Sequence, residues 1–351
     1  MMSQAFGYAS THAGAPLAPF HFERRDLRAN DVAIRILYCG VCHSDLHQAR
    51  NDWHNTVYPC VPGHEIVGEV TAVGASVTKV KPGAMVAIGC LVDSCRTCAS
   101  CEKGLEQYCE AYPTPTYNGR DRQTGEMTYG GYSDNIVTRE EFVMIMPDGL
   151  DPERAAPLLC AGITTWSPLR HWNAGPGKRV AVAGLGGLGH MAVKLAVALG
   201  ADVTVVTTSP SKAADARALG AHDVLISTDA DAMANARNRF DIVIDTIPVS
   251  HDVAPYLGIT ALDGATIVVG AIDMLPAIHS GSLLMGRKTL AGSIIGGMPE
   301  TQELLDFCAE KGVLPDCETI AIKDINTAFE RMERSDVKYR FVIDMDTLNA
   351  A

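Results

Sequence analysis

Short apolar segments separated by glycine- and proline-containing turns make up roughly the first 150 residues. Segments 32–37, 65–70 and 85–88 are examples, each rich in Val or Ile. The sequence Lys-Pro-Gly at 81–83 is a turn signal shortly before the third segment. This pattern predicts short strands and a β-rich first domain over residues 1–160.

The pattern changes near residue 155, where apolar strands begin to alternate with helical stretches. The alternation is typical of βαβ units and predicts a doubly wound parallel sheet over residues 161–298. Residues 299–351 contain a further helix and a final strand and are expected to return to the first domain. The fold class is therefore α/β. The expected strands are 179–183, 202–206, 240–245, 265–270 and 340–344, and the expected helices are 189–199, 212–219 and 301–311.

Composition excludes several classes of function. The net charge of -12 argues against a nucleic-acid partner or an anionic membrane surface. No apolar run reaches the ~18 residues that would span a bilayer. The chain has eleven cysteines and no secretory signal pattern, so we expect a reducing cytoplasm, where cysteines bind metals or take part in catalysis.

Four of the cysteines lie close together in a lobe expected over residues 90–112. Their spacing, C-x2-C-x2-C-x7-C, suits a closed tetrahedral zinc site with a structural role. An iron–sulfur cluster is the main alternative metal site, but the ferredoxin-type run ends in x3-C-P. Scattered thiols or disulfides are the alternative without a metal. The four residues are Cys95, Cys98, Cys101 and Cys109.

A glycine-rich segment follows the expected strand at 179–183 and begins the next helix, which is the setting that makes a G-x-G-x-x-G motif credible. The first glycine permits a tight turn, the second lets the backbone approach a pyrophosphate, and the third allows close packing of helix on strand. A glycine-rich turn without a ligand is the alternative. The predicted dinucleotide-binding residues are Gly184, Leu185, Gly186, Gly187, Leu188 and Gly189.

The end of the next strand separates the two nicotinamide cofactors, because NAD sites place an acidic residue there to bind the ribose hydroxyls. No acid occupies this strand end: Asp202 lies at its start and Asp215 lies in the following helix. Hydroxyl groups and a lysine can bind a 2′-phosphate instead, which favours NADP(H). Lys212 could alternatively be a solvated lysine at a helix start. The residues expected at the phosphate are Thr207, Thr208, Ser209 and Lys212.

Several motifs occur together in an order that resembles the zinc-dependent medium-chain alcohol dehydrogenases. The resemblance covers essentially the whole chain and is strongest to the cinnamyl-alcohol-dehydrogenase branch, especially its bacterial NADP-dependent aldehyde reductases. It implies a GroES-like catalytic domain joined to a Rossmann domain. Besides the four cysteines and the glycine-rich turn, the motifs are Gly40-Val-Cys42-His-Ser-Asp, Gly63-His64-Glu65-x2-Gly68, Cys160, Gly292-Ser293-x2-Gly296 and the tail from Asp336 to Asp344.

Carried over by motif, the resemblance implies a catalytic zinc bound by Cys42, His64 and Cys160, with Glu65 close to the metal. The reaction would be reversible hydride transfer between NADP(H) and the carbonyl carbon of an aldehyde, with zinc as the Lewis acid. Ser44 and His47 would form the proton relay, and Asp52 would orient it. Ser44 could also begin a helix as its N-cap.

The resemblance also implies residues beside the nicotinamide half of the cofactor, and a homodimer or a tetramer. The expected substrates are a broad range of aliphatic and aromatic aldehydes, including cinnamyl types, and the corresponding primary alcohols. Two alternatives stay open: a polyol or secondary-alcohol dehydrogenase of the same superfamily, and a non-catalytic dinucleotide sensor. The residues implied beside the nicotinamide are Thr164, Val269, Gly270, Ser293 and Ile295.

Overall fold

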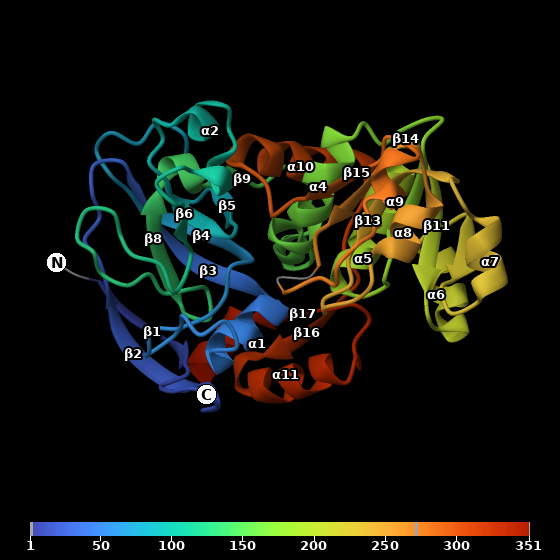
Figure 1. Cartoon of the computed structure of the whole chain (residues 1–351). Coiled ribbons are helices and arrows are strands. Elements are labelled where there is room, and N and C mark those ends of the chain that lie inside the picture. The colour runs from blue at the N-terminus through green and yellow to red at the C-terminus, as the bar shows by residue number, and fades with distance from the viewer. Residues whose placement is uncertain (1–2, 271–272, 351) are drawn as a thin grey trace. The chain divides into compact units, whose positions relative to one another are not determined.

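The computed structural model describes residues 3–270 and 273–350 and divides into two compact units (Figure 1). The first unit comprises Met1–Cys160 and Gly296–Ala351, and the second comprises Ala161–Ile295. The chain thus returns from the second unit to the first at Gly296, whereas the sequence pattern predicted this boundary after residue 298. The difference arises because the helix that follows begins at Met298, and its N-cap and lead-in already belong to the first unit.

The first unit is built from two separate stretches of the chain. Its elements are β1 (Ser3–Ala9), β2 (Ala18–Arg24), β3 (Asp31–Val41), α1 (His43–Arg50), β4 (Ile66–Val73), β5 (Met85–Ile88), β6 (Leu91–Asp93), α2 (Ala99–Glu102), η1 (Glu106–Tyr108), β7 (Thr114–Pro115), β8 (Asn135–Arg139), η2 (Glu140–Phe142), β9 (Met144–Ile145), α3 (Pro152–Ala155), η3 (Ala156–Leu159), α10 (Met298–Lys311), β16 (Cys317–Ala321), η5 (Ile322–Asp324), α11 (Ile325–Glu333), β17 (Arg340–Asp344) and η6 (Met345–Ala350).

A seven-stranded sheet organises the first unit. Its order is β16-β17-β3-β4-β5-β9, and β8 pairs with β3 beyond that path. The long strand β3 is central: β17 pairs with it antiparallel through Phe341↔Val41, and β4 pairs with it through Cys39↔Ile66. The C-terminal strands thus complete a sheet that starts near the N-terminus. Residues on either side of β3 are therefore brought together from opposite ends of the chain.

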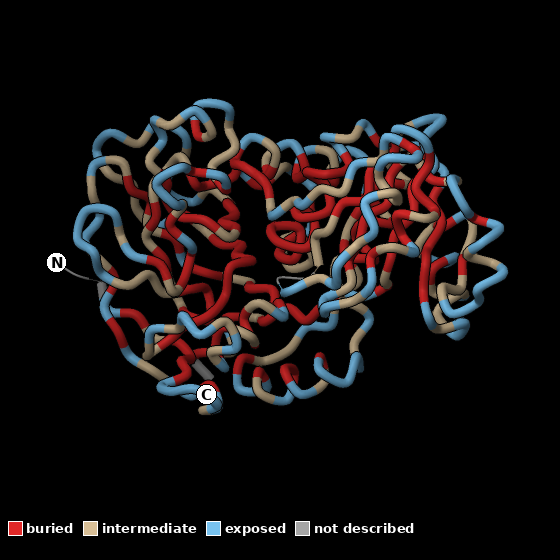
Figure 2. Tube along the Cα trace, in the orientation of Figure 1, coloured by how far each residue is buried: buried red, intermediate tan, exposed pale blue. Residues whose placement is uncertain are grey.

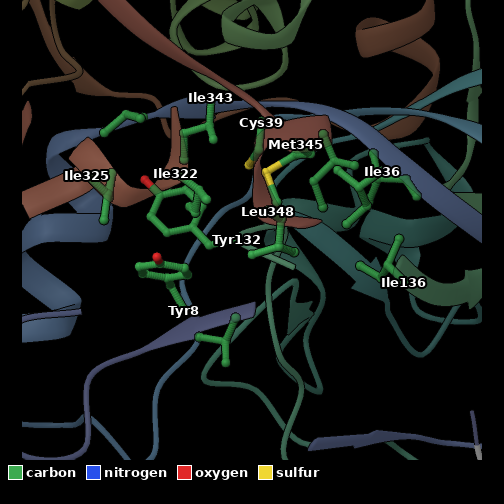
Figure 3. Packing of buried hydrophobic residues seen from close by; sticks show 14 of the residues in the cluster. Tyr8, Ile36, Cys39, Tyr132, Ile136, Ile322, Ile325, Ile343, Met345 and Leu348 are labelled. Carbon is green, nitrogen blue, oxygen red and sulfur yellow. The ribbon is translucent and has the colours of Figure 1, made fainter. Parts of the chain in front are cut away.

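The core of the first unit draws side chains from both stretches (Figure 3). Ile36 and Cys39 on β3 belong to the same buried cluster as Ile343 on β17 and Leu348. Each fully buried aliphatic side chain contributes about 2 kcal/mol relative to exposure. The C-terminal stretch therefore stabilises the sheet that carries the N-terminal motifs.

The second unit alternates strands and helices along one continuous stretch. Its elements are α4 (Ala161–His171), β10 (Arg179–Ala183), α5 (Gly187–Ala198), β11 (Asp202–Thr207), η4 (Pro210–Lys212), α6 (Ala213–Ala218), β12 (Asp223–Ile226), α7 (Ala230–Asn235), β13 (Phe240–Asp245), α8 (Ala254–Ile259), β14 (Thr260–Val268), α9 (Gly281–Leu284) and β15 (Thr289–Gly292).

All strands of the second unit pair in parallel, in the order β12-β11-β10-β13-β14-β15. This is the 3-2-1-4-5-6 order of a Rossmann fold, and it confirms the predicted doubly wound parallel sheet. Residues Val180 to Ala183 of β10 are fully buried, as are most residues of β13, which is typical of a parallel sheet enclosed by helices (Figure 2). The order reverses between β10 and β13, and such folds bind ligands at the carboxyl ends of these strands.

The strands and helices expected from the sequence are present, but β14 begins at Thr260 rather than 265 and α10 begins at Met298 rather than 301. The glycine-rich helix begins at Gly187 rather than 189, and the segment expected as one helix over 212–219 is the short turn η4 followed by α6. Pro210 explains the shift at η4, because proline fits the first turn of a helical segment and starts this one early. Across residues 3–270 and 273–350, no helix has the length and apolar composition needed to cross a membrane.

Candidate metal centres and dinucleotide site

The four predicted structural cysteines converge in one cluster between β6 and β7. Their sulfurs lie within 4.8 Å of one another, and the Sγ atoms of Cys95 and Cys101 are 3.9 Å apart. Tetrahedral zinc binds thiolates at about 2.3 Å, which places the sulfurs about 3.8 Å from each other. The cluster therefore has the size and donor set of a closed zinc site.

Backbone N–H groups point at these sulfurs. The amide of Cys98 donates to Cys95 Sγ at 3.3 Å, and the amide of Glu110 donates to Cys98 Sγ at 3.5 Å. Hydrogen bonds from the backbone, led by Thr97, lower the pKa of Cys95 to about 6. Those from Cys101 and Glu110 lower the pKa of Cys98. The backbone thus favours the thiolate, the form that binds a metal, at Cys95 and Cys98, whereas burial raises the pKa of Cys101 to about 12.

A second cluster combines different donor types and is assembled from three segments of the first unit. Cys42 follows β3, His64 and Glu65 precede β4, and Cys160 follows η3. All four are buried, and one donor atom from each lies within 4.8 Å of the others. The Sγ atoms of Cys42 and Cys160 are 3.9 Å apart. This distance again suits two thiolates on one zinc ion.

The Asp45 carboxylate accepts hydrogen bonds from residues of this mixed cluster and from their neighbours. Its Oδ1 accepts from His64 Nδ1 at 3.0 Å and from the Gly63 amide at 2.9 Å. Its Oδ2 accepts from the Cys42 amide at 2.9 Å and from the Tyr132 hydroxyl at 3.1 Å. The Nδ1–H of His64 is therefore committed to Asp45, which leaves Nε2 for a metal. Such carboxylate–histidine pairs orient metal ligands and increase their basicity.

Burial and neighbouring groups shift the pKa values of His64 and Cys42 in the mixed cluster. Burial is the largest single effect on His64 and lowers its pKa, but the charges of Asp45 and Cys90 and the hydrogen bonds to Asp45 and Cys42 together outweigh burial and raise the pKa well above its usual range. Hydrogen bonding from Cys160 lowers the pKa of Cys42. Cys42 is thus biased towards the thiolate in this setting.

Within the described part of the chain, only one of the two carboxylate oxygens of Glu65 accepts a hydrogen bond. Arg340 of β17 donates to its Oε1 within a fully buried pair. Its Oε2 is buried and has no hydrogen-bond partner among the residues that the structure describes. Burial raises the pKa of Glu65 to about 8. One carboxylate oxygen of Glu65 belongs to the mixed cluster, and a Cβ at Gly40 would lie only 1.9 Å from Oε2. Glycine at position 40 therefore leaves the space that this carboxylate occupies.

The donors of the mixed cluster fit zinc. Two thiols and one imidazole nitrogen match the ligands of a catalytic zinc site, and a site with three protein ligands keeps one position open. A carboxylate oxygen of Glu65 lies beside that set. The four-cysteine cluster has no such opening.

The three residues predicted for the proton relay lie on or next to α1. Ser44 is half-buried in its first turn, and His47 follows one turn later with about two-fifths of its side chain exposed. Nδ1 of His47 is 2.8 Å from Asp52 Oδ2. The alternative role of Ser44 as helix N-cap is wrong, because Cys42 is the N-cap and Asp45 closes the capping box. The Ser44 hydroxyl is therefore not used in capping.

The glycine-rich turn connects β10 to α5. Gly184 has a φ of +91°, which favours glycine. A Cβ at Gly189 would lie 2.2 Å from the Gly184 carbonyl oxygen, so the helix packs directly on the turn. A Cβ at Gly186 would meet open space, and Gly186 is the N-cap of α5. The structure thus places each glycine as the dinucleotide motif requires. Leu185, Gly187 and Leu188 complete the turn and the start of α5.

The segment expected to bind a 2′-phosphate lies at the carboxyl end of β11. Thr207 is the last residue of that strand, Thr208 is exposed, and the Ser209 amide donates to Thr207 Oγ1 at 3.2 Å. Lys212 Nζ donates to the Leu185 carbonyl at 3.2 Å, so this lysine lies against the glycine-rich turn. Asp202 is at the opposite end of β11, and Asp215 is in α6.

The remaining predicted cofactor residues are all in the second unit. Thr164 is buried in α4. The amides of Val269 and Gly270 donate to the Asp245 carbonyl at 2.9 and 3.2 Å, next to the glycine-rich turn. Ser293 follows β15, and Ile295 has a positive φ of 39°.

Sequence reasoning missed four residues. Asp45 lies within the quoted Cys42 motif, three residues after the ligand, and this spacing was the available signal. Arg340 lies within the quoted tail from Asp336 to Asp344, but nothing in that motif indicated its pairing with Glu65. Thr246 carried no local signal. No role was predicted for Cys90, but its thiol is half-buried and interacts with Cys160, whose pKa is raised by hydrogen bonding to Cys42 and Cys90. The other unassigned cysteines are buried or half-buried thiols: Cys39, Cys60, Cys308 and Cys317.

Two models of known protein families match this chain, one in each part of the sequence. A family model described as an alcohol dehydrogenase GroES-like domain matches residues 28–148, and one described as a zinc-binding dehydrogenase matches residues 187–310. The chain is 53% identical over 342 residues to aldehyde reductase YahK of Escherichia coli (strain K12), which covers 96% of this chain and 97% of that protein.

The similarity extends over the full length of other relatives. NADP-dependent alcohol dehydrogenase C 1 of Mycolicibacterium smegmatis is 50% identical over 350 residues, covering 99% of this chain and 100% of that protein. A solved structure of a cinnamyl alcohol dehydrogenase from Sorghum bicolor superposes with a TM-score of 0.95 at 44% identity, covering 98% of each chain.

Proposed function

The chain belongs to the zinc-dependent medium-chain alcohol dehydrogenases, in the branch of cinnamyl alcohol dehydrogenases and bacterial aldehyde reductases, and we propose that it reduces aldehydes with NADPH. The reverse reaction oxidises the corresponding primary alcohols with NADP⁺. The observation that carries the proposal is the buried mixed cluster, with two thiols 3.9 Å apart and an imidazole nitrogen left free by Asp45.

Cys42, His64 and Cys160 would hold the catalytic zinc, which supplies a Lewis acid for a carbonyl oxygen. Glu65, with its free buried oxygen, would be a fourth ligand when no substrate occupies the open position. Arg340 offsets the charge of Glu65 and holds its other oxygen. Cys95, Cys98, Cys101 and Cys109 would hold a second, structural zinc, so the holoenzyme contains two zinc ions.

NADP(H) would bind along the carboxyl edge of the Rossmann sheet and supplies the hydride. The glycine-rich turn at 184–189 would receive the pyrophosphate. Lys212 and the hydroxyls of Thr207, Thr208 and Ser209 would bind the 2′-phosphate, since β11 ends without an acid. Thr164, Val269, Gly270, Ser293 and Ile295 would border the nicotinamide half.

The first helix would move the proton that the product alcohol requires. Ser44 Oγ donates to the substrate oxygen, and His47 replaces that proton from solvent, to which its ring is partly exposed. Asp52 accepts from the His47 Nδ1–H at 2.8 Å, which orients the ring and leaves Nε2 for proton exchange.

Initial rates test the proposal with aliphatic, aromatic and cinnamyl aldehydes, each with NADPH and with NADH, and with sorbitol in the oxidation direction. We expect aldehyde reduction with NADPH to be fastest. Equal or faster rates with NADH would contradict the cofactor assignment, and faster sorbitol oxidation would favour the polyol alternative. Dinucleotide binding without turnover of any substrate would favour the non-catalytic sensor.

The variant Lys212→Ala sharpens the cofactor test. Loss of one phosphate contact should weaken NADPH binding about tenfold and leave NADH binding unchanged, because only NADPH carries the 2′-phosphate. Equal weakening of both cofactors would mean that Lys212 supports the glycine-rich turn through Leu185 instead.

We also propose that the protein is a homodimer located in the cytoplasm. Strand β15 is at the edge of the Rossmann sheet, and an exposed strand edge can pair with a second copy of itself. Exposed apolar side chains lie nearby in sequence, including Leu284 and Met285 on and after α9. All eleven cysteines are free, which agrees with a reducing compartment. Light scattering should give the mass of a dimer or, alternatively, of a tetramer.

A further inference from the structure

A buried carboxylate and a histidine pair at the carboxyl end of β13. Asp245 is the last residue of that strand and is fully buried. The ring of His251, from the connection between β13 and α8, places Nε2 at 2.7 Å from Asp245 Oδ2 and Nδ1 at 2.8 Å from the Val249 carbonyl. Tyr256 packs its ring against the edge of His251, with centroids 5.7 Å apart. The histidine therefore links the strand end to the loop that follows it.

The same carboxylate also shapes the turn directly after β13. Its Oδ1 accepts from the Ile247 amide at 3.1 Å, while Oδ2 faces His251. A carbonyl oxygen and a carboxylate both accept hydrogen bonds, so the imidazole satisfies both partners only with a hydrogen on each nitrogen, or with the shared proton on Asp245. In either state one proton-bearing bridge joins the strand to the loop.

The residue after Asp245 lies against the glycine-rich turn. Thr246 Oγ1 donates to the Ala183 carbonyl at 2.7 Å, and the Thr246 amide donates to the same oxygen at 2.9 Å. A Cβ at Gly184 would lie 2.8 Å from Thr246 Oγ1, and one at Gly189 would lie 3.2 Å from it. Thr246 therefore occupies the space that these glycines leave open.

On the opposite side, the same segment supports the Val269–Gly270 backbone. Both amides donate to the Asp245 carbonyl, and a Cβ at Gly270 would lie 2.4 Å from the Thr246 carbonyl carbon. Residues 245–247 are thus packed between the two backbone segments assigned to the dinucleotide. A small displacement of this segment moves both, because neither contact has space to absorb it.

We propose that His251 is a positioning residue for the dinucleotide: its bridge to Asp245 sets the spacing between the glycine-rich turn and Val269–Gly270. This inference rests on the proposed function, since it assigns NADPH as the ligand of that edge. The bridge acts on binding rather than on the hydride-transfer step.

Three variants of the full-length zinc-loaded enzyme test the inference, with NADPH as the probe. His251→Leu removes both hydrogen bonds while keeping a side chain of moderate volume, and His251→Gln keeps one donor towards Asp245. His222→Leu is the matched control: its Nδ1 accepts from the Val203 amide at 3.0 Å and lies 3.7 Å from Asp202, at the amino edge of the same sheet. Fluorescence titration gives the Kd for NADPH, and thermal unfolding gives the Tm.

For His251→Leu we expect the Kd for NADPH to rise about tenfold, as loss of a charge-assisted hydrogen bond predicts, with kcat at saturating NADPH within about twofold of wild type. His251→Gln should recover part of the affinity, and His222→Leu should change only the Tm. An unchanged Kd in both His251 variants, with a lowered Tm, would overturn the inference and leave a purely structural role. If His251→Leu does not fold, His251→Ala replaces it, and an unaltered Kd in that variant overturns the inference equally.

Wild-type titration separates this inference from the proposed function. Absence of NADPH and NADH binding to the wild-type enzyme would contradict the proposed function itself. Tight wild-type binding combined with unaltered His251 variants would contradict only the positioning role.

Discussion

The two metal-binding clusters differ in how the chain builds them. Cys95, Cys98, Cys101 and Cys109 lie within one short segment, and backbone amides of that same segment point at their sulfurs. Cys42 and Cys160 are 118 residues apart, and Arg340, which pairs with Glu65, is 275 residues from it. One cluster is local, and the other depends on the seven-stranded sheet.

The difference also separates their chemistry. The local cluster offers only thiols, which fill every position around a metal and leave no place for a substrate. The assembled cluster mixes thiols, an imidazole and a carboxylate oxygen, and Asp45 orients two of its residues. The comparison teaches that a structural site can be encoded in a loop, whereas an open site needs a rigid sheet around it.

Removal of a ligand from the assembled cluster should have the largest effect. Cys42→Ala leaves the site without one of its three protein ligands, so we expect zinc content to fall from two ions to one and aldehyde reduction to fall by at least about 10³-fold. Metal analysis and initial rates measure both. Cys317→Ala, a half-buried cysteine outside both clusters, is the control and should keep both ions. Retention of two zinc ions in Cys42→Ala would contradict the assignment.

Removal of a ligand from the local cluster should act on stability first. For Cys101→Ala we expect loss of the other zinc ion and a free energy of unfolding lower by at least about 4 kcal/mol, as loss of a structural metal implies. Turnover per remaining zinc should be unchanged in the folded fraction. Denaturant unfolding and active-site titration test this. A loss of turnover at full stability would mean that the local cluster takes part in the reaction.

Substitution of a carboxylate that lies next to a cluster should have a smaller effect, on zinc affinity. Asp45→Asn weakens the partner of His64, so catalytic zinc should dissociate about 10- to 100-fold more readily in competition with a chelator. Asp93→Asn is the reciprocal control, because Asp93 accepts from the Ser94 amide beside the four-cysteine cluster. If Asp45→Asn and Asp93→Asn weakened the same metal ion, the two clusters would not be independent.

The smallest effect concerns an ion pair close to the local cluster. Burial tends to raise the pKa of Asp121, but hydrogen bonds from Arg28, Thr124 and Gln123 outweigh it and lower the pKa below its usual range. A lowered folded-state pKa means that the stabilisation is present above the unfolded value of about 3.9 and is lost as pH falls through the folded value.

We therefore expect Asp121→Asn to lower the free energy of unfolding by about 1 kcal/mol at pH 7. The difference from wild type should shrink as pH falls below about 4. Urea unfolding across this range measures it. A difference that does not change with pH would mean that Asp121 acts through the shape of its loop rather than through its charge.

Some elements and site residues of this chain could be predicted from the sequence more fully than others. The strand–helix alternation predicted the Rossmann sheet, because a buried parallel strand and an amphipathic helix each leave a periodic pattern in a short stretch. The glycine-rich turn and the four-cysteine cluster were equally visible, since each is specified by spacing alone. The proposed ligands Cys42, His64 and Cys160 were predicted only through the family resemblance, because no spacing connects them.

The chain by itself determined the elements, the glycine positions and the closed thiol cluster, since these depend on neighbours a few residues apart. The tertiary structure alone decided that Asp45 holds His64, that Arg340 from the last strand faces Glu65, and that His251 bridges to Asp245. Each contact joins segments that meet only after folding, and in two of them one partner, Arg340 or Asp245, lies on a strand. A shift of one residue in the register of β17 or β13 would turn Arg340 or Asp245 to the other face of its sheet.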